Sequence, residues 1–139
     1  MSIRIVRLGS PRSSDEGVRL GTVRRPPRGV PKKEFSRRDF YDVWLPILAP
    51  TSALVDEARS ANDAAAWRRF VRKYRAEMSE PDASRTLDLL AAMSHSANFS
   101  VGCYCADEAR CHRRILRELL LERGARLEPA APASHRSAF

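Results

Sequence analysis

The sequence predicts an α/β fold: a single compact domain in which a small, mostly parallel sheet is flanked by helices. Its 139 residues suit one domain and are enough to bury a core without help from disulfides or metals. Two short apolar segments lie near the N-terminus, and the second half of the chain runs helix, strand, helix, which is the order of a parallel crossover. We expect the domain to span residues 1–127 and residues 128–139 to form a flexible tail.

The N-terminal third predicts two strands followed by an irregular loop. Residues 3–8 and 18–23 are apolar-rich, and a polar stretch containing turn-forming residues separates them. Residues 24–33 combine three prolines with five cations, which excludes a regular helix and leaves the loop facing solvent or a ligand. Residues 35–50 contain aromatic side chains and two prolines, and we expect short helical turns there.

Three helices are expected next. The first runs to about Ser60 from a cap at residues 51–52, and the second covers residues 64–78 behind a cap at residues 62–63. Apolar residues recur along the second helix at the spacing of a core-facing stripe. They are Trp67, Phe70, Val71, Tyr74 and Met78. The third helix begins at Pro81 and continues through Met93, and its many apolar positions predict burial on several sides.

The last elements are a strand over residues 99–103 and a helix over about 109–123 that Gly124 terminates. In an open parallel sheet, ligands bind at the carboxyl ends of the strands, where helix N-termini offer free N–H groups. The residues between this strand and this helix are therefore the first place to look for a site.

The charge of the chain points to anionic partners. Lys and Arg number 25 against 17 Asp and Glu, which gives a net charge of +8, and such a balance suits an anionic small molecule or a nucleic acid. A merely solvated basic surface is the competing explanation. No stretch approaches the ~20 apolar residues of a membrane span, and the N-terminus lacks a secretory signal. We therefore expect a cytoplasmic protein with no membrane partner.

The stretch 101–114 concentrates reactive side chains. Cys103, Cys105 and Cys111 lie within nine residues of one another. An odd number of cysteines in a reducing compartment argues for thiols with a local role rather than a disulfide framework. The same stretch holds His112, Asp107, Glu108, Arg110, Arg113 and Arg114.

Three interpretations of this stretch remain open. In the first, Cys105 or Cys111 is a reactive thiol, His112 its base or hydrogen-bond partner, and Asp107 or Glu108 an orienting carboxylate. The second is a metal site that uses Cys103, Cys105, Cys111 and His112. Because Cys111 and His112 are neighbours on the expected helix, they should point about 100° apart, which weakens this interpretation. The third is structural, with buried thiols and a core histidine.

Several motifs, in order, resemble the DUF488 family, including its YeaO-like branch. They are Arg24-Arg25-Pro26-Pro27-Arg28-Gly29-Val30, Tyr41-Asp42-Val43-Trp44, Ala49-Pro50, Trp67-Arg68-Arg69-Phe70 with Tyr74, Cys103-Tyr104-Cys105 and Cys111-His112-Arg113. The resemblance covers residues 3–124 and implies a compact bacterial α/β domain of unknown function. It does not say whether the protein is an enzyme, or which cofactor it uses.

In YeaO-like members the proline-rich loop reads Asp-Arg-Leu-Trp-Pro-Arg-Gly. Arg24, Pro27, Arg28 and Gly29 match this pattern, whereas Val23 and Pro26 replace the acidic residue and the tryptophan. If this loop meets the cysteine-rich loop at the edge of the sheet, the two form a basic pocket for a phosphate-bearing ligand. Its expected ligand-binding residues are Arg24, Arg28, Arg110 and Arg113. A non-catalytic nucleic-acid-binding protein is the alternative, using Arg68, Arg69, Arg72, Lys73 and Arg75. A metal-binding or thiol redox-sensing protein is another.

Overall fold

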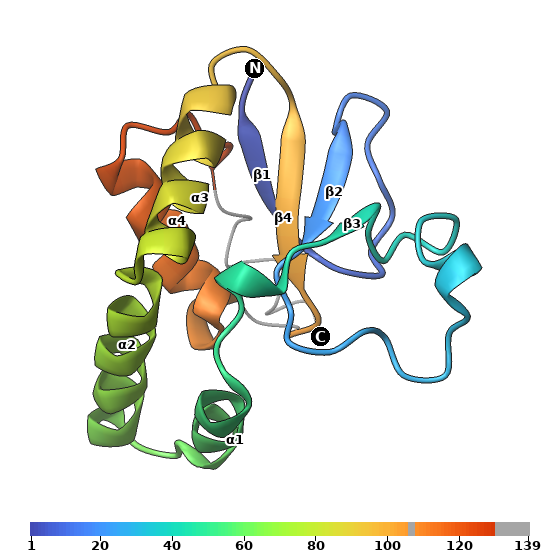
Figure 1. Cartoon of the computed structure of the whole chain (residues 1–139). Helices are drawn as coiled ribbons and strands as arrows, with labels where there is room; N and C mark the ends of the chain where they lie inside the picture. Colours follow the sequence, from blue (N-terminus) through green and yellow to red (C-terminus); the bar gives the residue numbers. More distant parts are fainter. Residues whose placement is uncertain (106–107, 130–139) are drawn as a thin grey trace.

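The computed structural model describes residues 1–105 and 108–129. Within them the chain forms one parallel sheet of four strands in the order β1-β4-β2-β3 (Figure 1). The strands are β1 (Ile3–Arg7), β2 (Val18–Gly21), β3 (Val43–Trp44) and β4 (Phe99–Cys103). The expected α/β domain with a parallel sheet is confirmed. Residues 130–139, most of the expected tail, lie outside the described residues.

The central strand β4 organises the sheet. It pairs with β1 from Ile3 opposite Phe99 and with β2 from Val18 opposite the same Phe99. The edge strand β3 was not expected, since residues 35–50 predicted helical turns. Only Pro46–Leu48 (η2) and Lys32–Glu34 (η1) form short 3-10 helices in this part of the chain. A strand of two residues is too short to produce an alternating pattern, which explains why the sequence does not reveal β3.

Four α-helices lie in the described residues: α1 (Ser52–Ser60), α2 (Ala64–Met78), α3 (Pro81–Met93) and α4 (His112–Glu122). The first three confirm the expected bounds, and the side chain of Asp63 caps α2 by accepting from the Ala66 N–H at 2.7 Å. The expected start of the last helix, near residue 109, is wrong. Residues Glu108–Arg110 form a separate 3-10 turn, η3, and α4 begins only at His112.

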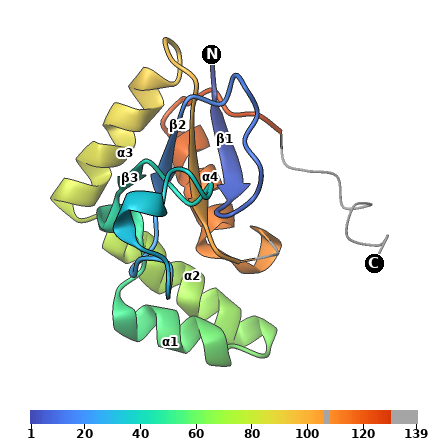
Figure 2. The same ribbon diagram turned by 90° about the vertical axis from the view of Figure 1, so that its right-hand side faces the viewer.

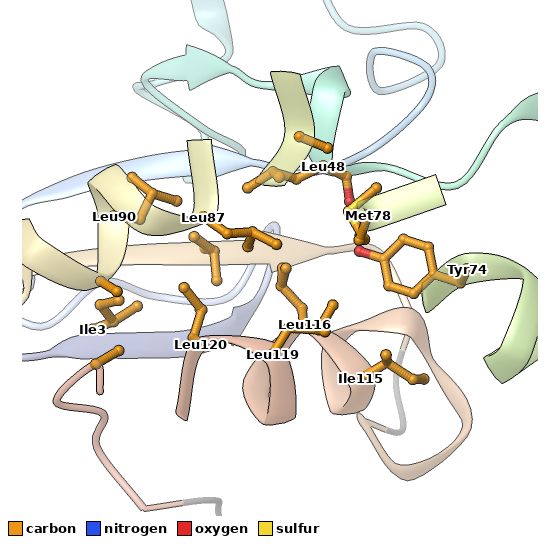
Figure 3. Packing of buried hydrophobic residues seen from close by; sticks show 14 of the residues in the cluster. Ile3, Leu48, Tyr74, Met78, Leu87, Leu90, Ile115, Leu116, Leu119 and Leu120 are labelled. Atoms are coloured by element: carbon orange, nitrogen blue, oxygen red, sulfur yellow. The ribbon is translucent and has the colours of Figure 1, made fainter. Parts of the chain in front are cut away.

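The main core lies between one face of the sheet and the helices (Figure 3). Ile3, Phe99 and Val101 point into it from the strands, and Leu87 and Leu120 from α3 and α4. The stripe on α2 is confirmed as core, because Phe70, Tyr74 and Met78 are buried and Trp67 and Val71 pack against them. The expected burial of α3 on several sides is wrong: Leu89 is 58% exposed and Met93 39%.

Loops, rather than helices, cover the other face of the sheet. Alternation along the strands places Arg19 and Ser100 on this face, and both are fully buried beneath the loop that carries Glu16. Further along β2, the ring of Tyr41 packs against Gly21, where any side chain would collide with it. One face is thus apolar, and the other is buried but polar.

All four strands point toward the end of the molecule where α1 and α2 lie (Figures 1 and 2). The carboxyl ends of the strands therefore share one edge, which we call the carboxyl edge. The loops that follow β2 and β4 begin there. In the described residues no helix combines the length and the apolar character needed to cross a bilayer.

Candidate functional site

A group of thiol, imidazole and guanidinium side chains lies at the carboxyl edge. Cys103 is the last residue of β4, Cys111 is the residue before α4, and His112 and Arg113 are the first two residues of that helix. We call these four residues the thiol cluster. The expected position of the site, at the junction of this strand and this helix, agrees with where these side chains meet.

Two neighbouring residues, Cys111 and His112, both contribute to the cluster because the helix starts between them. Cys111 has the extended conformation of an N-cap residue, with φ −135° and ψ 154°, so the two side chains do not follow helical spacing. The Sγ of Cys111 lies 3.7 Å from Nδ1 of His112. The expectation that the two side chains diverge by about 100° on one helix is therefore wrong. The geometric objection to a metal site, which rested on that expectation, no longer applies.

The ring of His112 is held in one orientation. Its Nε2 lies 2.7 Å from the carbonyl oxygen of Thr22, just after β2, and a carbonyl can only accept, so Nε2 carries the proton. The ring also packs edge-on against Tyr74, with centroids 5.5 Å apart. Burial lowers the pKa of His112 to about 4, so the imidazole is neutral at pH 7. The unprotonated Nδ1 then faces the sulfur of Cys111.

The two buried thiols are in close contact. Cys103 and Cys111 are both free and buried, and their sulfurs lie 2.6 Å apart. Hydrogen bonds from the thiols of Cys103 and Cys105 lower the pKa of Cys111, and Arg113 lowers it further. Hydrogen bonds of Cys103 to the sulfurs of Cys105 and Cys111, together with burial, raise the pKa of Cys103, which keeps its proton. The pair therefore favours one thiolate, on Cys111.

Arg113 brings a positive charge into the interior. It is 3% exposed, and its Nη2 donates to the carbonyl oxygen of Cys105 at 2.6 Å. Its Nε has no hydrogen-bond partner, and none of the described carboxylates forms a salt bridge with it. Glu108, a nearby carboxylate, is itself paired with Arg117 at 2.7 Å. A buried cation without a carboxylate is unusual in a protein interior.

The proline-rich loop and the loop after β4 meet through their backbones. Besides the contact of His112 with Thr22, the hydroxyl of Tyr104 donates to the carbonyl oxygen of Arg25 at 2.9 Å. The guanidinium of Arg24 points elsewhere, toward the η2 turn. It donates to the carbonyl oxygens of Pro46, Ala49 and Pro50.

The other expected site residues lie around the cluster. Arg28 is exposed, and Arg110 lies over the ring of Trp67, with its Cζ 5.7 Å from the centroid. Cys105 is exposed. Asp107, the expected orienting carboxylate, lies outside the described residues. The structure thus brings Cys103, Cys111, His112 and Arg113 together, and it shows Arg24 and Arg110 in other contacts.

Two contributions to the cluster have no signal in the sequence. The Thr22 carbonyl orients His112, but a backbone oxygen leaves no trace in residue identity. Tyr74 belongs to the core stripe of α2, and its hydroxyl donates to the Leu48 carbonyl at 2.6 Å. Its contact with His112 follows only from how α2 and α4 pack.

Comparison with known proteins identifies the family. No curated protein and no solved structure matches the chain. A family model, DUF488-N3a, described as the active DUF488-N3 subclade, matches residues 3–124. That span contains β1 through α4 and every residue of the thiol cluster. The chain therefore belongs to the DUF488 family, in its active N3a subclade.

Proposed function

We propose that the protein binds and acts on a phosphate-bearing anion at the carboxyl edge of the sheet, beside the thiol cluster. The observation that carries this proposal is a set of arginines that end β1, lie in the loop after β2, or lie between β4 and the first turn of α4. In the described residues none of them forms a salt bridge with a carboxylate, unlike Arg12 and Arg123, and they differ from the unpaired arginines of α2 in lying beside the thiol cluster's strand and helix. The set consists of Arg7, Arg24, Arg25, Arg28, Arg110 and Arg113.

Guanidinium groups suit phosphate because their planar donors match two of its oxygens at once. The N-terminus of α4 adds a partial positive charge at the same place. Arg25 and Arg28 are exposed and are the residues we propose to contact the ligand first. Arg24, held by three carbonyl oxygens, positions the loop.

The description of the subclade as active favours an enzyme over a purely binding protein. We assign the chemistry to the thiol cluster, in particular Cys111 and His112, with Cys105 and Asp107 as the other candidate residues. A cytoplasmic location and membership of the YeaO-like branch belong to the same proposal. The matches at Arg24 and Arg28 support that branch.

A second candidate function is non-catalytic nucleic-acid binding by α2. Of the five cations predicted for this role, Lys73 pairs with Glu57, and Arg75 pairs with carboxylates of α4. Arg68, Arg69 and Arg72 are exposed, and in the described part of the chain they form no salt bridge. Each of these three cations could neutralise one phosphate of a nucleic-acid strand.

The test compares variants in fluorescence anisotropy with a labelled single-stranded DNA oligonucleotide, using AMP and inorganic phosphate as competitors. Removing the exposed cations of the carboxyl edge with R25Q/R28Q should weaken binding and reduce the slope of log K against log salt by about 1.4, because each contact with a single strand contributes about 0.7. The matched control is Arg85→Gln, an exposed arginine on α3, which should leave both values unchanged.

The variant R68Q/R72Q separates the two candidates. If it abolishes binding while R25Q/R28Q binds as the wild type does, the interface is on α2 and the proposed site is wrong. Competition by AMP and by inorganic phosphate would indicate a small phosphate-bearing ligand. Binding of the oligonucleotide that neither compound displaces would indicate a nucleic-acid strand.

A further inference from the structure

The thiol cluster presents a set of soft donor atoms that converge on one point. One ligand atom from each of Cys103, Cys111 and His112 lies within 4.8 Å of the others. Thiolate sulfur and imidazole nitrogen are the donors that zinc prefers. We infer that these three residues bind one thiophilic divalent cation of the zinc type, with the fourth coordination position open. The inference deepens the proposed function, because it names the group that would meet the anion.

The imidazole is already prepared as a ligand. A metal-bound histidine almost always donates its second ring N–H to a carboxylate or a backbone carbonyl, which fixes the ring. In this chain the Thr22 carbonyl accepts from Nε2 at 2.7 Å, and Nδ1 faces the sulfur of Cys111. The nitrogen left free to bind a metal is therefore the one on the side of the thiols.

The ligands come from rigid elements on two sides of the point where they converge. Cys103 ends the central strand, Cys111 is the N-cap residue of α4, and His112 is the first residue of that helix. The sulfurs lie 2.6 Å apart. Two sulfurs bound to one tetrahedral zinc at ~2.3 Å are separated by about 3.8 Å. Binding therefore requires the two side chains to move apart by about 1 Å, which a small rotation of Cys111, outside the helix, can provide.

The local charge favours an anion at the fourth position. A divalent cation with two thiolates and a neutral imidazole has no net charge. Arg113, buried beside it without a carboxylate partner among the described residues, then leaves the centre with an excess of one positive charge. Cys105 is exposed, and although its thiol hydrogen-bonds to those of Cys103 and Cys111, it is not one of the three converging residues. We therefore assign it to the border of the open position and not to the fixed ligands. An open position on zinc is typical of catalytic rather than structural sites.

The first experiment measures bound metals by elemental mass spectrometry on untagged protein, with free thiols counted in the same sample. Wild type should hold close to one equivalent of zinc or a similar ion, and both buried thiols should be protected from reagents. Cys103→Ser should lose the metal. Cys105→Ser, two residues away, tests whether the fourth position is open, and this variant should retain the metal.

Two results would overturn the inference. Metal-free protein that takes up no added Zn²⁺, or whose Cys103 and Cys111 are isolated as a disulfide, would show that the pair does not form a metal site. Loss of metal from Cys105→Ser as complete as from Cys103→Ser would show that Cys105 closes the site. Circular dichroism of each variant confirms that metal loss does not simply report unfolding.

The second experiment tests the open position with Co²⁺ in place of zinc. Thiolate-to-cobalt charge transfer should be present in wild type and in Cys105→Ser, and inorganic phosphate should shift the visible d–d bands. A full complement of Co²⁺ with bands insensitive to phosphate and to other small anions would exclude the open position. Because metal content and oligonucleotide binding are measured separately, a metal site without anion binding would refute only the proposed function. Anion binding without a metal would refute only this inference.

Discussion

Two buried polar regions of this molecule differ in how well their groups are satisfied. On the loop-covered face of the sheet, the guanidinium of Arg19 makes two bonds to Glu16, and Ser100 donates to the same carboxylate at 2.6 Å. Arg19 also donates to the carbonyl oxygens of Ser10 and Asp39. We call Glu16, Arg19 and Ser100 the paired network. In the thiol cluster, by contrast, Arg113 is as deeply buried, but its Nε has no partner.

The difference separates a structural from a functional use of buried charge. Buried polar groups in proteins are nearly always hydrogen-bonded, and one that is not calls for an explanation. The paired network contains its own counter-charge and holds the β1-β2 loop against β2 and β4. The thiol cluster lacks a carboxylate in the described residues and lies at the carboxyl edge, where a cation or an anion from solution can complete it.

The largest effect is expected from breaking the paired network. Arg19→Met leaves the carboxylate of Glu16 buried and unpaired, which should lower the free energy of unfolding by about 3–5 kcal/mol. Urea denaturation followed by tryptophan fluorescence measures it. Adding Glu16→Gln to this variant should recover part of the loss, because the unpaired charge is then gone.

The control for that experiment is Arg37→Met, since Arg37 pairs with Glu34 while 74% of its side chain is exposed. This substitution should lower the free energy of unfolding by less than about 1 kcal/mol. Equal losses in Arg19→Met and Arg37→Met would contradict the distinction between buried and exposed pairs.

The two regions also differ in how far the sequence foretells them. Helices α1, α2 and α3 follow from caps and from apolar spacing, both of which are local signals. The paired network does not, because Glu16 lies in a loop and Ser100 is 84 residues from it along the chain. Only the register of β2 against β4 brings Arg19 and Ser100 together.

For the thiol cluster, the composition of residues 101–114 indicates the place but not the geometry. The cysteines, His112 and Arg113 are recognisable in the sequence because they are adjacent. The start of α4 is not, and a shift of about three residues decides whether Cys111 is helical or a cap. With Cys111 as a cap, the geometry favours a metal site, whereas with Cys111 inside the helix it does not. For this site the exact first residue of α4 is therefore more informative than the presence of the helix.

A second, smaller effect concerns Asp42, which joins the loops over the paired network. Its carboxylate accepts from both terminal nitrogens of Arg12 and from the Arg19 backbone N–H. Although burial opposes ionisation, these bonds and one from Ser36 lower the pKa of Asp42 from 3.8 to about 2. The group therefore stabilises the fold fully above pH 4, and this stabilisation is lost as the pH falls toward 2.

We expect Asp42→Asn to lower the free energy of unfolding by about 1 kcal/mol at pH 6, a value reduced by the solvent exposure of the pair. The difference between wild type and variant should shrink as the pH is lowered to 3 and below. Urea titrations at several pH values measure it, and Glu16, present in both proteins, cancels from the comparison. A difference that does not change with pH would show that the carboxylate charge of Asp42 contributes nothing.

The smallest effect on stability is expected from Arg113→Met, the counterpart of Arg19→Met in the thiol cluster. Methionine keeps much of the length of the arginine stem, and the change leaves no carboxylate unpaired among the described residues. The Cys111 thiolate loses a neighbouring cation, but in the metal-free protein it can take up a proton. The loss of the bond to the Cys105 carbonyl is offset by removing a buried charge, so the free energy of unfolding should change by about 1 kcal/mol or less.

Binding of inorganic phosphate to the cobalt-substituted protein of this Arg113→Met variant should nevertheless weaken, because the excess positive charge is gone. A loss of stability as large as that of Arg19→Met would mean that Arg113 is paired like Arg19. Unchanged stability together with unchanged phosphate binding would remove Arg113 from the site.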